Sequence, residues 1–420
     1  MTPEVKQRIE QIRQGIVPEG YKKTKSDIVP VDWKESSIGE YICEYTEKTT
    51  IPNQYPVLTS ARTGLMLQTE YYSNRQVTTE NNVGYNILPF GYVTFRSRSD
   101  DGRFRFNENR IIERGIISYF YPVFSFSEEV CHEYMLYLLN FSIYRRMYPY
   151  AEGTAQQVLS LKKLGQLKYS LPLVAEQKKI AEILATQDKA IELQGRKIEE
   201  LKRFKKGCLE KMFPRKGQKV PEKRFPGFTD DWEQRKLGEL GTITTGSTPS
   251  TAIPDYYSDD GIVWVTPTDI CENITFESAR KLSDLGQQVG RVVPKNTILV
   301  TCIASIGKNT MLGSTGSFNQ QINGLTPNEN ECDPYFLLTE SALWSAKMKS
   351  SAAAGTMQIV NRTEFSELKT WLPSLIEQQA ISDFFRQLDY LITLHQRKLE
   401  EMKKQKKALM QLLLTGIVRV

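Results

Sequence analysis

"LPLVAEQKKIAEIL" runs from Leu171 to Leu184, and "LPSLIEQQAISDFF" runs from Leu372 to Phe385, at an offset of 201 residues. At the same offset, "GRKIEELKRFKKGCLEKMF" (195–213) is followed by "QRKLEEMKKQKKALMQLLL" (396–414). Matches sustained over so long a stretch at one spacing indicate an internal duplication. The question is what the repeated segment does.

The duplication extends to both ends of each half. Asp188 matches Asp389, and Lys205-Lys206 matches Lys406-Lys407, again at an offset of 201. A weaker match opens each half, where Asp32-Trp33 corresponds to Asp231-Trp232. Residues 45–150 and 245–350 show no convincing match. The sequence therefore predicts two equivalent halves that are alike at their ends and different in between.

Each repeated segment reads as a long helix with a coiled-coil seam. Seam positions that alternate steps of four and three are apolar at seven of ten places in the first copy and at eight of ten in the second. Pro172 and Pro373 mark the helix starts. Each helix is expected to span about 60 Å. The predicted interface residues are Ile180, Leu184, Ile191, Ile198, Leu201, Ile381, Phe385, Leu388, Ile392, Leu399 and Met402.

Matched length and register favour two helices that pack on each other, antiparallel and with pseudo-twofold symmetry. The alternative is two unrelated amphipathic helices, each packed on its own domain. Between the repeats, short β-prone runs separated by turn residues precede an apolar helix, once in each half. The expected fold class is therefore α+β, with two mixed α/β domains joined by the long helices.

The predicted organisation has seven segments. They are an N-terminal helical segment (1–30), a first α+β domain (31–170), the first repeated helix (171–213), a basic linker (214–228), a second α+β domain (229–371), the second repeated helix (372–415) and a C-terminal tail (416–420). Around the linker, residues 202–224 hold ten Lys or Arg against two Glu. This stretch is either a solvated basic face or a contact to DNA phosphates.

Polar residues suited to nucleic-acid contact gather in loops of both domains. In the first domain, arginines alternate with phenylalanines, so a hairpin would separate the two on opposite faces. Arginine suits guanine edges and phosphates, although a solubilising face is an equal alternative. The candidates in the first domain are Ser60, Arg62, Thr63, Arg96, Arg98, Arg103 and Arg105. Those in the second are Thr245, Ser247, Thr248, Ser250, Thr266, Thr268, Lys308, Asn319 and Gln320.

Motifs for catalysis or metal binding are missing from the sequence. Gly307-Lys308 lacks the spacing of a phosphate loop, and Asp333-Pro334-Tyr335-Phe336 lacks the second proline of an amino-methyltransferase site. No glycine-rich cofactor loop accompanies it, and the chain has 2 histidines. Net charge is +6, cysteines form no CxxC pair, and no run suits a signal peptide or membrane span. We expect a reduced, cytoplasmic, non-catalytic protein without a cofactor or metal of its own.

The whole chain resembles the specificity subunit of type I restriction-modification enzymes. The resemblance rests on two dissimilar domains, each closed by the repeated helix, on "GSTPS" (246–250) and "TPTDI" (266–270), and on the ending "LLLTGIVRV". It implies that each domain reads one half of a bipartite, asymmetric double-stranded DNA site. It also implies that the helices set the gap between half-sites.

The resemblance further implies partners. The helices would dock two methyltransferase subunits that use S-adenosylmethionine to methylate adenine, and restriction subunits that use ATP and magnesium would join them. Two other functions remain open from the residues alone. One is a coiled-coil scaffold joining two protein-binding domains without DNA, and the other is a self-sufficient methyltransferase, which the absent cofactor loop disfavours.

Overall fold

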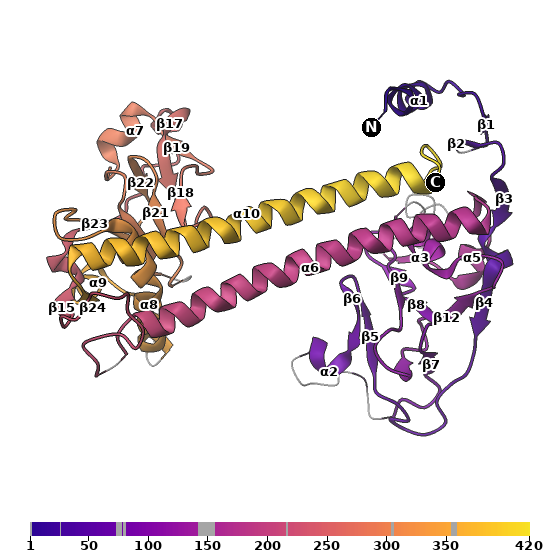
Figure 1. Ribbon diagram of the computed structural model, residues 1–420, viewed down its shortest axis with the longest axis horizontal. Helices are drawn as coiled ribbons and strands as arrows, with labels where there is room; N and C mark the ends of the chain where they lie inside the picture. Colours follow the sequence, from indigo (N-terminus) through magenta and orange to yellow (C-terminus); the bar gives the residue numbers. More distant parts are fainter. Residues whose placement is uncertain are drawn as a thin grey trace. The chain divides into compact units, whose positions relative to one another are not determined.

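The computed structural model describes residues 2–25, 27–72, 78, 81–141, 156–215, 217–303, 306–353 and 359–420. The chain forms two compact units (Figure 1). Unit 1 comprises Met1–Gln194 and Lys398–Val420, and unit 2 comprises Gly195–Arg397. Each unit therefore contains part of both long helices, α6 (Val174–Met212) and α10 (Leu375–Leu414).

The N-terminal segment is only partly helical. Helix α1 (Pro3–Arg13) is followed by an antiparallel pair of strands, β1 (Tyr21–Lys23) and β2 (Ile28–Pro30). The prediction of a helical segment over 1–30 was therefore too broad, because Gly15 and Gly20, both with positive φ, stop the helix and turn the chain into the strand pair.

Unit 1 surrounds a four-stranded antiparallel sheet in the order β10-β8-β12-β4. Its strands are β4 (Ile42–Tyr45), β8 (Val93–Phe95), β10 (Phe106–Glu108) and β12 (Val123–Phe126). Helix α3 (His132–Phe141) buries Tyr134, Met135, Leu138 and Leu139 in the same core. This is the apolar helix that the sequence predicts after the strands of the first half, and residues 142–155 lie outside the described residues.

Smaller pairs complete unit 1. They are β3 (Lys34–Ser37) with β14 (Lys168–Leu171), β5 (Leu58–Ala61) with β6 (Gly64–Leu67), β7 (Asn86–Pro89) with β11 (Arg114–Ile117), and β9 (Arg98–Ser99) with β13 (Gln157–Val158). Three short helical elements join them: η1 (Ile38–Tyr41), α2 (Gln68–Tyr71) and α5 (Leu161–Gly165). Gly39 in η1 meets Gly165 in α5 so closely that a Cβ at Gly39 would lie 2.9 Å from the Gly165 carbonyl oxygen.

Unit 2 has a five-stranded sheet in the order β16-β23-β20-β21-β18. Its strands are β16 (Gly241–Thr245), β18 (Ile274–Thr275), β20 (Ile298–Thr301), β21 (Asn309–Leu312) and β23 (Ile322–Pro327). A second sheet is ordered β19-β17-β22, from β17 (Tyr257–Val265), β19 (Lys281–Leu282) and β22 (Gly316–Phe318). The remaining elements are η3 (Leu237–Glu239), η4 (Pro254–Tyr256), α7 (Asp284–Val289), α8 (Pro334–Ala353), α9 (Arg362–Ser366) and the paired strands β15 (Glu233–Lys236) and β24 (Lys369–Leu372).

The two units share one strand order despite their unlike sequences. In unit 1 the neighbours run β4-β12-β8-β10, and in unit 2 they run β16-β23-β20-β21, with β18 added at the end. In both, the sheet follows a short 3-10 helix, and a strand pair brings the start of the domain next to the start of its long helix. The α+β fold, used twice, is confirmed.

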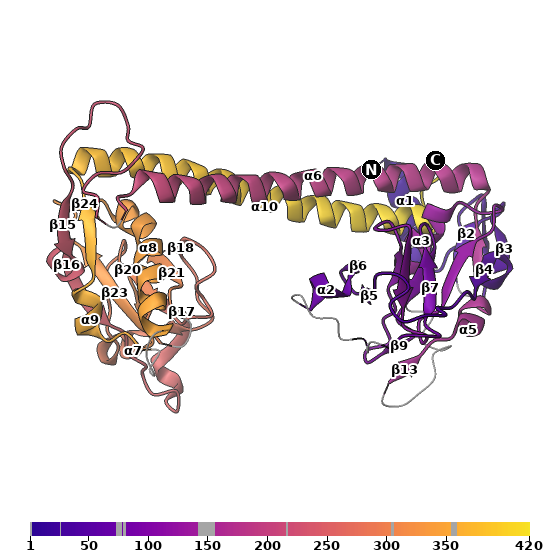
Figure 2. The same cartoon turned by 90° about the horizontal axis from the view of Figure 1, so that it is seen from below.

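The long helices pack antiparallel within each unit. The core of unit 1 combines Ile180 and Leu184 from the beginning of α6 with Leu413 from the end of α10. Unit 2 combines Met212 from the end of α6 with Phe385 from the beginning of α10. Figures 1 and 2 both show the start of α6 beside the end of α10 in unit 1. The antiparallel packing predicted from the seam is confirmed.

Burial follows the heptad pattern along both helices. Every seam position from Ile180 to Met212 and from Ile381 to Leu413 is buried or half-buried. Among the predicted interface residues, the buried ones are Ile180, Leu184, Ile198, Ile381, Phe385, Leu388 and Ile392. The half-buried ones are Ile191, Leu201, Leu399 and Met402.

The repeated glutamine at each helix start has a structural role. Gln177 donates to the Pro172 carbonyl at 2.9 Å and accepts from the Cys131 backbone N–H at 2.8 Å. Gln378 does the same with the Pro373 carbonyl and the Asp333 N–H, both at 2.9 Å. Each glutamine thereby ties the start of a long helix to the helix of its own domain.

Among the described helices, none is long and apolar enough to cross a membrane. The described side chains also contain no group of three His, Cys, Asp or Glu placed to hold a metal ion.

Candidate nucleic-acid interface

A cavity of about 340 Å³ in unit 1 brings the arginine candidates together. Its lining includes all seven candidates predicted in the first domain: Ser60, Arg62, Thr63, Arg96, Arg98, Arg103 and Arg105. They come from the β5–β6 hairpin and from the segment between β8 and β10, which includes the short strand β9. We refer to this cavity as the arginine pocket. Residues distant in the sequence thus form one strongly basic surface.

The fold directs these arginines outward because the intervening phenylalanines enter the core. Strands β8 and β10 pair with Phe95 opposite Phe106, and their rings lie 4.7 Å apart. Phe104 is also buried, and its ring meets Phe95 edge to face. The predicted separation of an aromatic face from an arginine face is confirmed. Packing on the aromatic side fixes where the arginine side chains begin.

The seven candidates differ in how they are held. Arg62 forms an ion pair with Asp101 at 2.8 Å, while Arg103 lies 3.9 Å from the same carboxylate. Arg98 places its guanidinium 4.7 Å from the ring centre of Phe120, a cation–π contact. Ser60 is buried and accepts a hydrogen bond from Asn107 at 2.8 Å. Ser60 therefore shapes the hairpin, whereas Arg96, Arg98 and Thr63 present exposed side chains.

Arg105 lies where the pocket approaches helix α6. Burial lowers the pKa of Arg105, and the carboxylate of Asp188 on α6 acts in the opposite direction. An arginine stays charged under either influence.

Three tyrosines in the pocket lining were missed by the sequence analysis. Tyr71 and Tyr72 are exposed, and their rings meet edge to face at 4.7 Å. Tyr121 also lines the pocket, where burial raises the pKa of its hydroxyl and Arg96 lowers it. Aromatic rings beside arginines offer stacking surfaces for bases. The signal was the doubled tyrosine, which follows the Ser60–Thr63 hairpin closely in the chain.

In unit 2, the polar candidates gather at one set of strand ends. Thr248 donates a hydrogen bond to Gln320, and the Asn319 N–H donates to the Val265 carbonyl at 3.0 Å. Lys308 donates to the Pro267 carbonyl at 3.0 Å. These contacts join the loops that follow β16, precede β21, follow β17 and follow β22. The separate sequence segments therefore form one polar surface, which we call the second polar cluster.

Exposure sorts the members of the second polar cluster. The exposed candidates are Thr248, Ser250, Thr268, Lys308 and Gln320. The others are half-buried and take part in internal bonds. Thr245 donates to Asn323 at 2.7 Å, Ser247 accepts from the Arg291 N–H at 2.9 Å, and Thr266 contacts Thr268 at 2.8 Å. Part of the segment "ASIGKNT" (304–310) lies outside the described residues.

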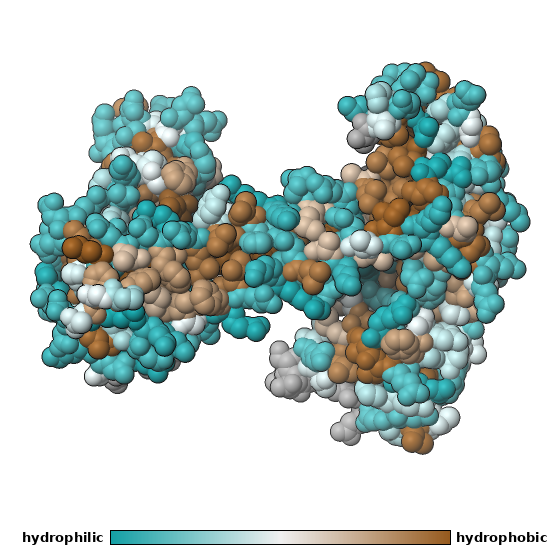
Figure 3. All heavy atoms as spheres, viewed as in Figure 1, coloured by the Kyte–Doolittle hydropathy of each residue, from teal (hydrophilic) through white to brown (hydrophobic). Residues whose placement is uncertain are grey.

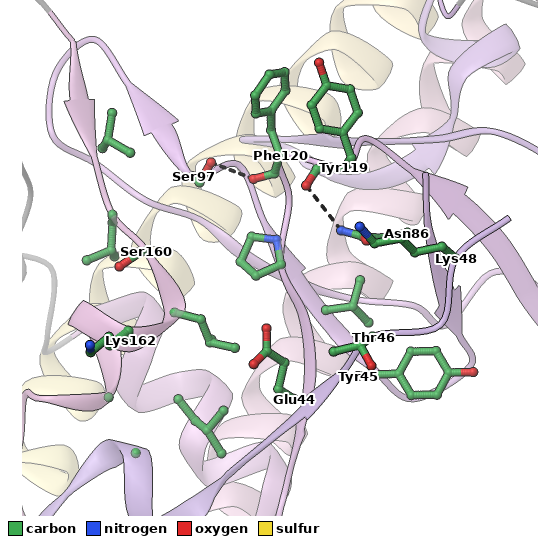
Figure 4. A pocket seen from close by; sticks show the side chains of 18 residues that line it. Glu44, Tyr45, Thr46, Lys48, Asn86, Ser97, Tyr119, Phe120, Ser160 and Lys162 are labelled. Atoms are coloured by element: carbon green, nitrogen blue, oxygen red, sulfur yellow. Dashed lines mark hydrogen bonds between the residues drawn. The ribbon is translucent and has the colours of Figure 1, made fainter. Parts of the chain in front are cut away.

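A larger groove of about 780 Å³ adjoins the arginine pocket at Phe120 (Figure 4). Ser97 on its rim donates to the Phe120 carbonyl at 2.7 Å. Its charged lining residues are Glu44, Lys48 and Lys162, so its charge is mixed. The arginine pocket carries five arginines and Asp100, and it is therefore the stronger anion site of the two.

The basic linker is largely engaged within unit 2. Arg224 binds Glu377 through two hydrogen bonds of 2.6 and 2.7 Å. Arg215 pairs with Glu222 at 3.2 Å, and Lys219 pairs with Asp231 at 3.4 Å. Arg215 and Lys219 are 59% and 70% exposed, which agrees with the solvated face, whereas the buried bond of Arg224 was not predicted. The linker fastens the end of α6 to the beginning of α10.

Comparisons with known proteins agree with this architecture. A family model described as "Type I restriction modification DNA specificity domain" matches residues 30–203 and 229–404. One relative is the putative type I restriction enzyme MjaX specificity subunit of Methanocaldococcus jannaschii, 26% identical over 299 residues that cover 68% of each chain. Another is the HindI specificity subunit of Haemophilus influenzae, 28% identical over 167 residues that cover 37% of this chain and 36% of the relative.

Solved structures also resemble the chain. A type I restriction-modification S subunit from M. genitalium aligns with a TM-score of 0.53 at 15% identity, over 96% of this chain and 99% of that one. A chain from "Structural basis underlying complex assembly and conformational transition of the type I R-M system" aligns with a TM-score of 0.57 at 15% identity, over 93% and 99%. At this identity the likeness concerns the fold.

Proposed function

Because the chain belongs to the type I restriction-modification DNA specificity family, with one matched domain in each half, we propose that each half reads one part of a bipartite, asymmetric DNA target. The observation that carries this proposal is the arginine pocket. Five arginines and three tyrosines converge there from loops that have no sequence counterpart in the other half. Arginine reads guanine edges and binds phosphates, and exposed rings stack on bases.

The unlike loops support two different half-sites. Unit 1 presents arginines and tyrosines, whereas the second polar cluster of unit 2 presents threonines, Lys308 and Gln320. Glutamine can pair with an adenine edge, and hydroxyls accept and donate to several bases. Two surfaces of such different chemistry on one repeated framework suit an asymmetric site.

The chain in this proposal recognises DNA and leaves the chemistry to partner subunits. Two methyltransferase subunits carrying S-adenosylmethionine, and restriction subunits using ATP and magnesium, would supply it. Support comes from the sequence, which lacks a cofactor loop, and from the relatives, which are named specificity subunits of type I restriction enzymes.

The long helices would set the gap between half-sites and dock the methyltransferase subunits. Both carry exposed apolar side chains on their outer faces, and Figure 3 shows brown patches along them among teal residues. Leu193 and Leu394 occupy equivalent positions of the repeat and are 55% and 48% exposed. Tyr390 lies four residues before Leu394 on α10 and adds an aromatic ring that is 67% exposed. Apolar surface of this kind marks contact sites for protein partners.

The deciding experiment is methylation mapping. The chain is co-expressed with its methyltransferase subunit in a host free of adenine methylation, and the subunit alone serves as the control. We expect a gapped, two-part adenine motif that requires the chain. Two results together would instead favour a protein scaffold without DNA. One is a stable complex that adds no methylated motif, and the other is a DNA affinity that does not fall as the salt concentration rises.

The pocket itself is tested by Arg96→Ala and Arg98→Ala. We expect both to relax or weaken reading of one half-site while the other keeps its sequence. Arg114→Ala is the matched control, since Arg114 lies on the same unit outside the pocket and pairs with Glu47 at 3.1 Å. An equal loss for every DNA sequence would make Arg96 and Arg98 phosphate contacts rather than base readers.

A further inference from the structure

Two carboxylates duplicated in the sequence each join three helices. Asp188 on α6 accepts a hydrogen bond from Tyr137 on α3 at 2.8 Å, and it forms an ion pair with Lys406 on α10. We call this set node 1, and it lies wholly within unit 1. Asp188 thereby connects the recognition domain with both long helices.

Unit 2 contains the same arrangement with the two long helices exchanged. Asp389 on α10 accepts a hydrogen bond from Tyr335 on α8 at 2.9 Å and pairs with Lys205 on α6 at 2.6 Å. We call this set node 2. In both nodes Oδ1 receives the lysine and Oδ2 receives the tyrosine, so the two contacts occupy separate oxygens.

These charged groups stand at a place that usually holds apolar residues. Lys205 and Lys406 occupy seam positions of the heptad pattern, and their side chains are 23% and 21% exposed. Partial burial of a charge costs free energy unless the charge is paired, and such pairs add little net stability. A polar seam residue more often fixes one geometry among alternatives. The occurrence of the same node in both units therefore indicates that the nodes position the recognition domains on the helices.

A cation from helix α10 also packs on the tyrosine ring of each node. In node 1 the Lys406 ammonium lies 5.4 Å from the ring centre of Tyr137, and the field of Asp188 reaches Arg105 in the arginine pocket. In node 2 the guanidinium of Arg386 lies 4.9 Å from the ring centre of Tyr335. Rotation of a recognition domain about its helices would separate the tyrosine from the aspartate and disturb these contacts.

We propose that the two Tyr–Asp–Lys nodes hold each recognition domain at one angle on the helix pair and so restrict the chain to a single gap between half-sites. This inference rests on the proposed function, since it concerns how strictly a bipartite target is measured. Residues of the nodes are positioning residues and touch no base. Helix length sets the preferred gap, and the nodes prevent recognition of sites whose gap is slightly longer or shorter.

The test compares methylation at sites whose gap differs by one base pair from the preferred length. Asp188→Asn and Asp389→Asn each replace the carboxylate by a neutral amide, which keeps one acceptor oxygen but cannot form an ion pair with lysine. We expect roughly tenfold more methylation at off-length sites than the wild type gives, with unchanged half-site sequences, which corresponds to losing one charge-assisted bond. Tyr137→Phe and Tyr335→Phe remove one hydroxyl each. They should also raise methylation at off-length sites, but by less than the aspartate variants.

Glu400→Gln and Glu199→Gln are the matched controls. Both residues form exposed ion pairs within the same long helices, with Lys403 at 2.8 Å and with Lys202 at 3.0 Å. They should keep the wild-type gap. Binding of the complex with methyltransferase subunits to duplexes of graded gap length gives the second readout, with a flatter profile expected for the node variants.

A node variant that methylates fewer sites but keeps one gap length would overturn the inference, because lower stability alone has that effect. If an aspartate variant does not fold, the hydroxyl deletions decide the matter. A wild-type chain that directs no gapped motif at all would overturn the proposed function as well. The two failures are thus distinguishable.

Discussion

Arg224→Met should destabilise unit 2 strongly, because it leaves a buried carboxylate without its partner. Arg224 grips both oxygens of Glu377 at 2.6 and 2.7 Å. The Glu377 side chain is 1% exposed and that of Arg224 is 15% exposed. The hydrogen bond to Glu377 raises the pKa of Arg224. Methionine keeps the apolar stem and removes only the guanidinium.

The expected loss is about 3 kcal/mol. Removing one partner of a buried ion pair costs roughly 3–5 kcal/mol, because the remaining charge is neither paired nor hydrated. The lower end applies here, since Glu377 stands in the first turn of α10, where the helix dipole favours a negative charge. For a unit of this size, such a loss lowers the midpoint of thermal unfolding by about 6–12 °C.

Urea denaturation followed by tryptophan fluorescence suits the measurement, because four of the five tryptophans lie in unit 2, at 232, 264, 344 and 371. Arg215→Met is the matched control from the same linker, since its pair with Glu222 is exposed and should contribute less than about 1 kcal/mol. The double variant Arg224→Met/Glu377→Leu should recover most of the stability. The reasoning is refuted if Arg224→Met and Arg215→Met unfold at the same urea concentration, or if the double variant is less stable than Arg224→Met.

Arg419→Met should cost less, about 1–2 kcal/mol, because Arg419 binds Glu176 and Asp32 from a position that is 39% exposed. These residues lie in unit 1, so urea denaturation is followed by circular dichroism for this variant. Glu340→Gln should stabilise the protein by up to about 3 kcal/mol at pH 8 and hardly at pH 4.5, measured by unfolding at both values. Burial raises the pKa of Glu340 to about 7, so the wild type loses stability as pH rises from the unfolded value of 4.5 through 7, whereas glutamine does not titrate. Insertion of one heptad into either long helix should change the gap of the methylated motif or abolish binding, and an unchanged motif would contradict the measuring role of the helices.

Local patterns in the sequence were enough to predict the long helices and the outward arginines. The heptad seam depends on side chains three and four residues apart, and its positions from Ile180 to Met212 and from Ile381 to Leu413 are buried or half-buried. Alternation along a strand likewise assigns Phe95 and Phe106 to the core and leaves Arg96 and Arg98 exposed. Both inferences need only neighbours in the chain.

Long-range pairing could not be predicted in the same way. The strand order shared by the two sheets arises from contacts between segments that have no sequence match, so the repeat was visible only at its ends. The bond between Arg224 and Glu377 spans 153 residues, and that between Arg419 and Glu176 spans 243. Neither arginine lies inside the repeated helix, so their shared role emerges only when the chain is folded.

These contacts explain how one framework can carry two unlike reading surfaces. In each half, the repeated residues form the same three kinds of contact. A glutamine ties the helix start to its domain, a glutamate pairs with an arginine, and an aspartate joins three helices. The candidate DNA-contacting residues lie in the loops between these anchors, where the two halves have no match. Exchanging Arg96 or Thr248 therefore leaves every anchor in place, while exchanging Asp188 or Asp389 alters an anchor and replaces none of the candidate reading residues. On the proposed function, base preference and gap length would be carried by different residues, so that each could change without the other.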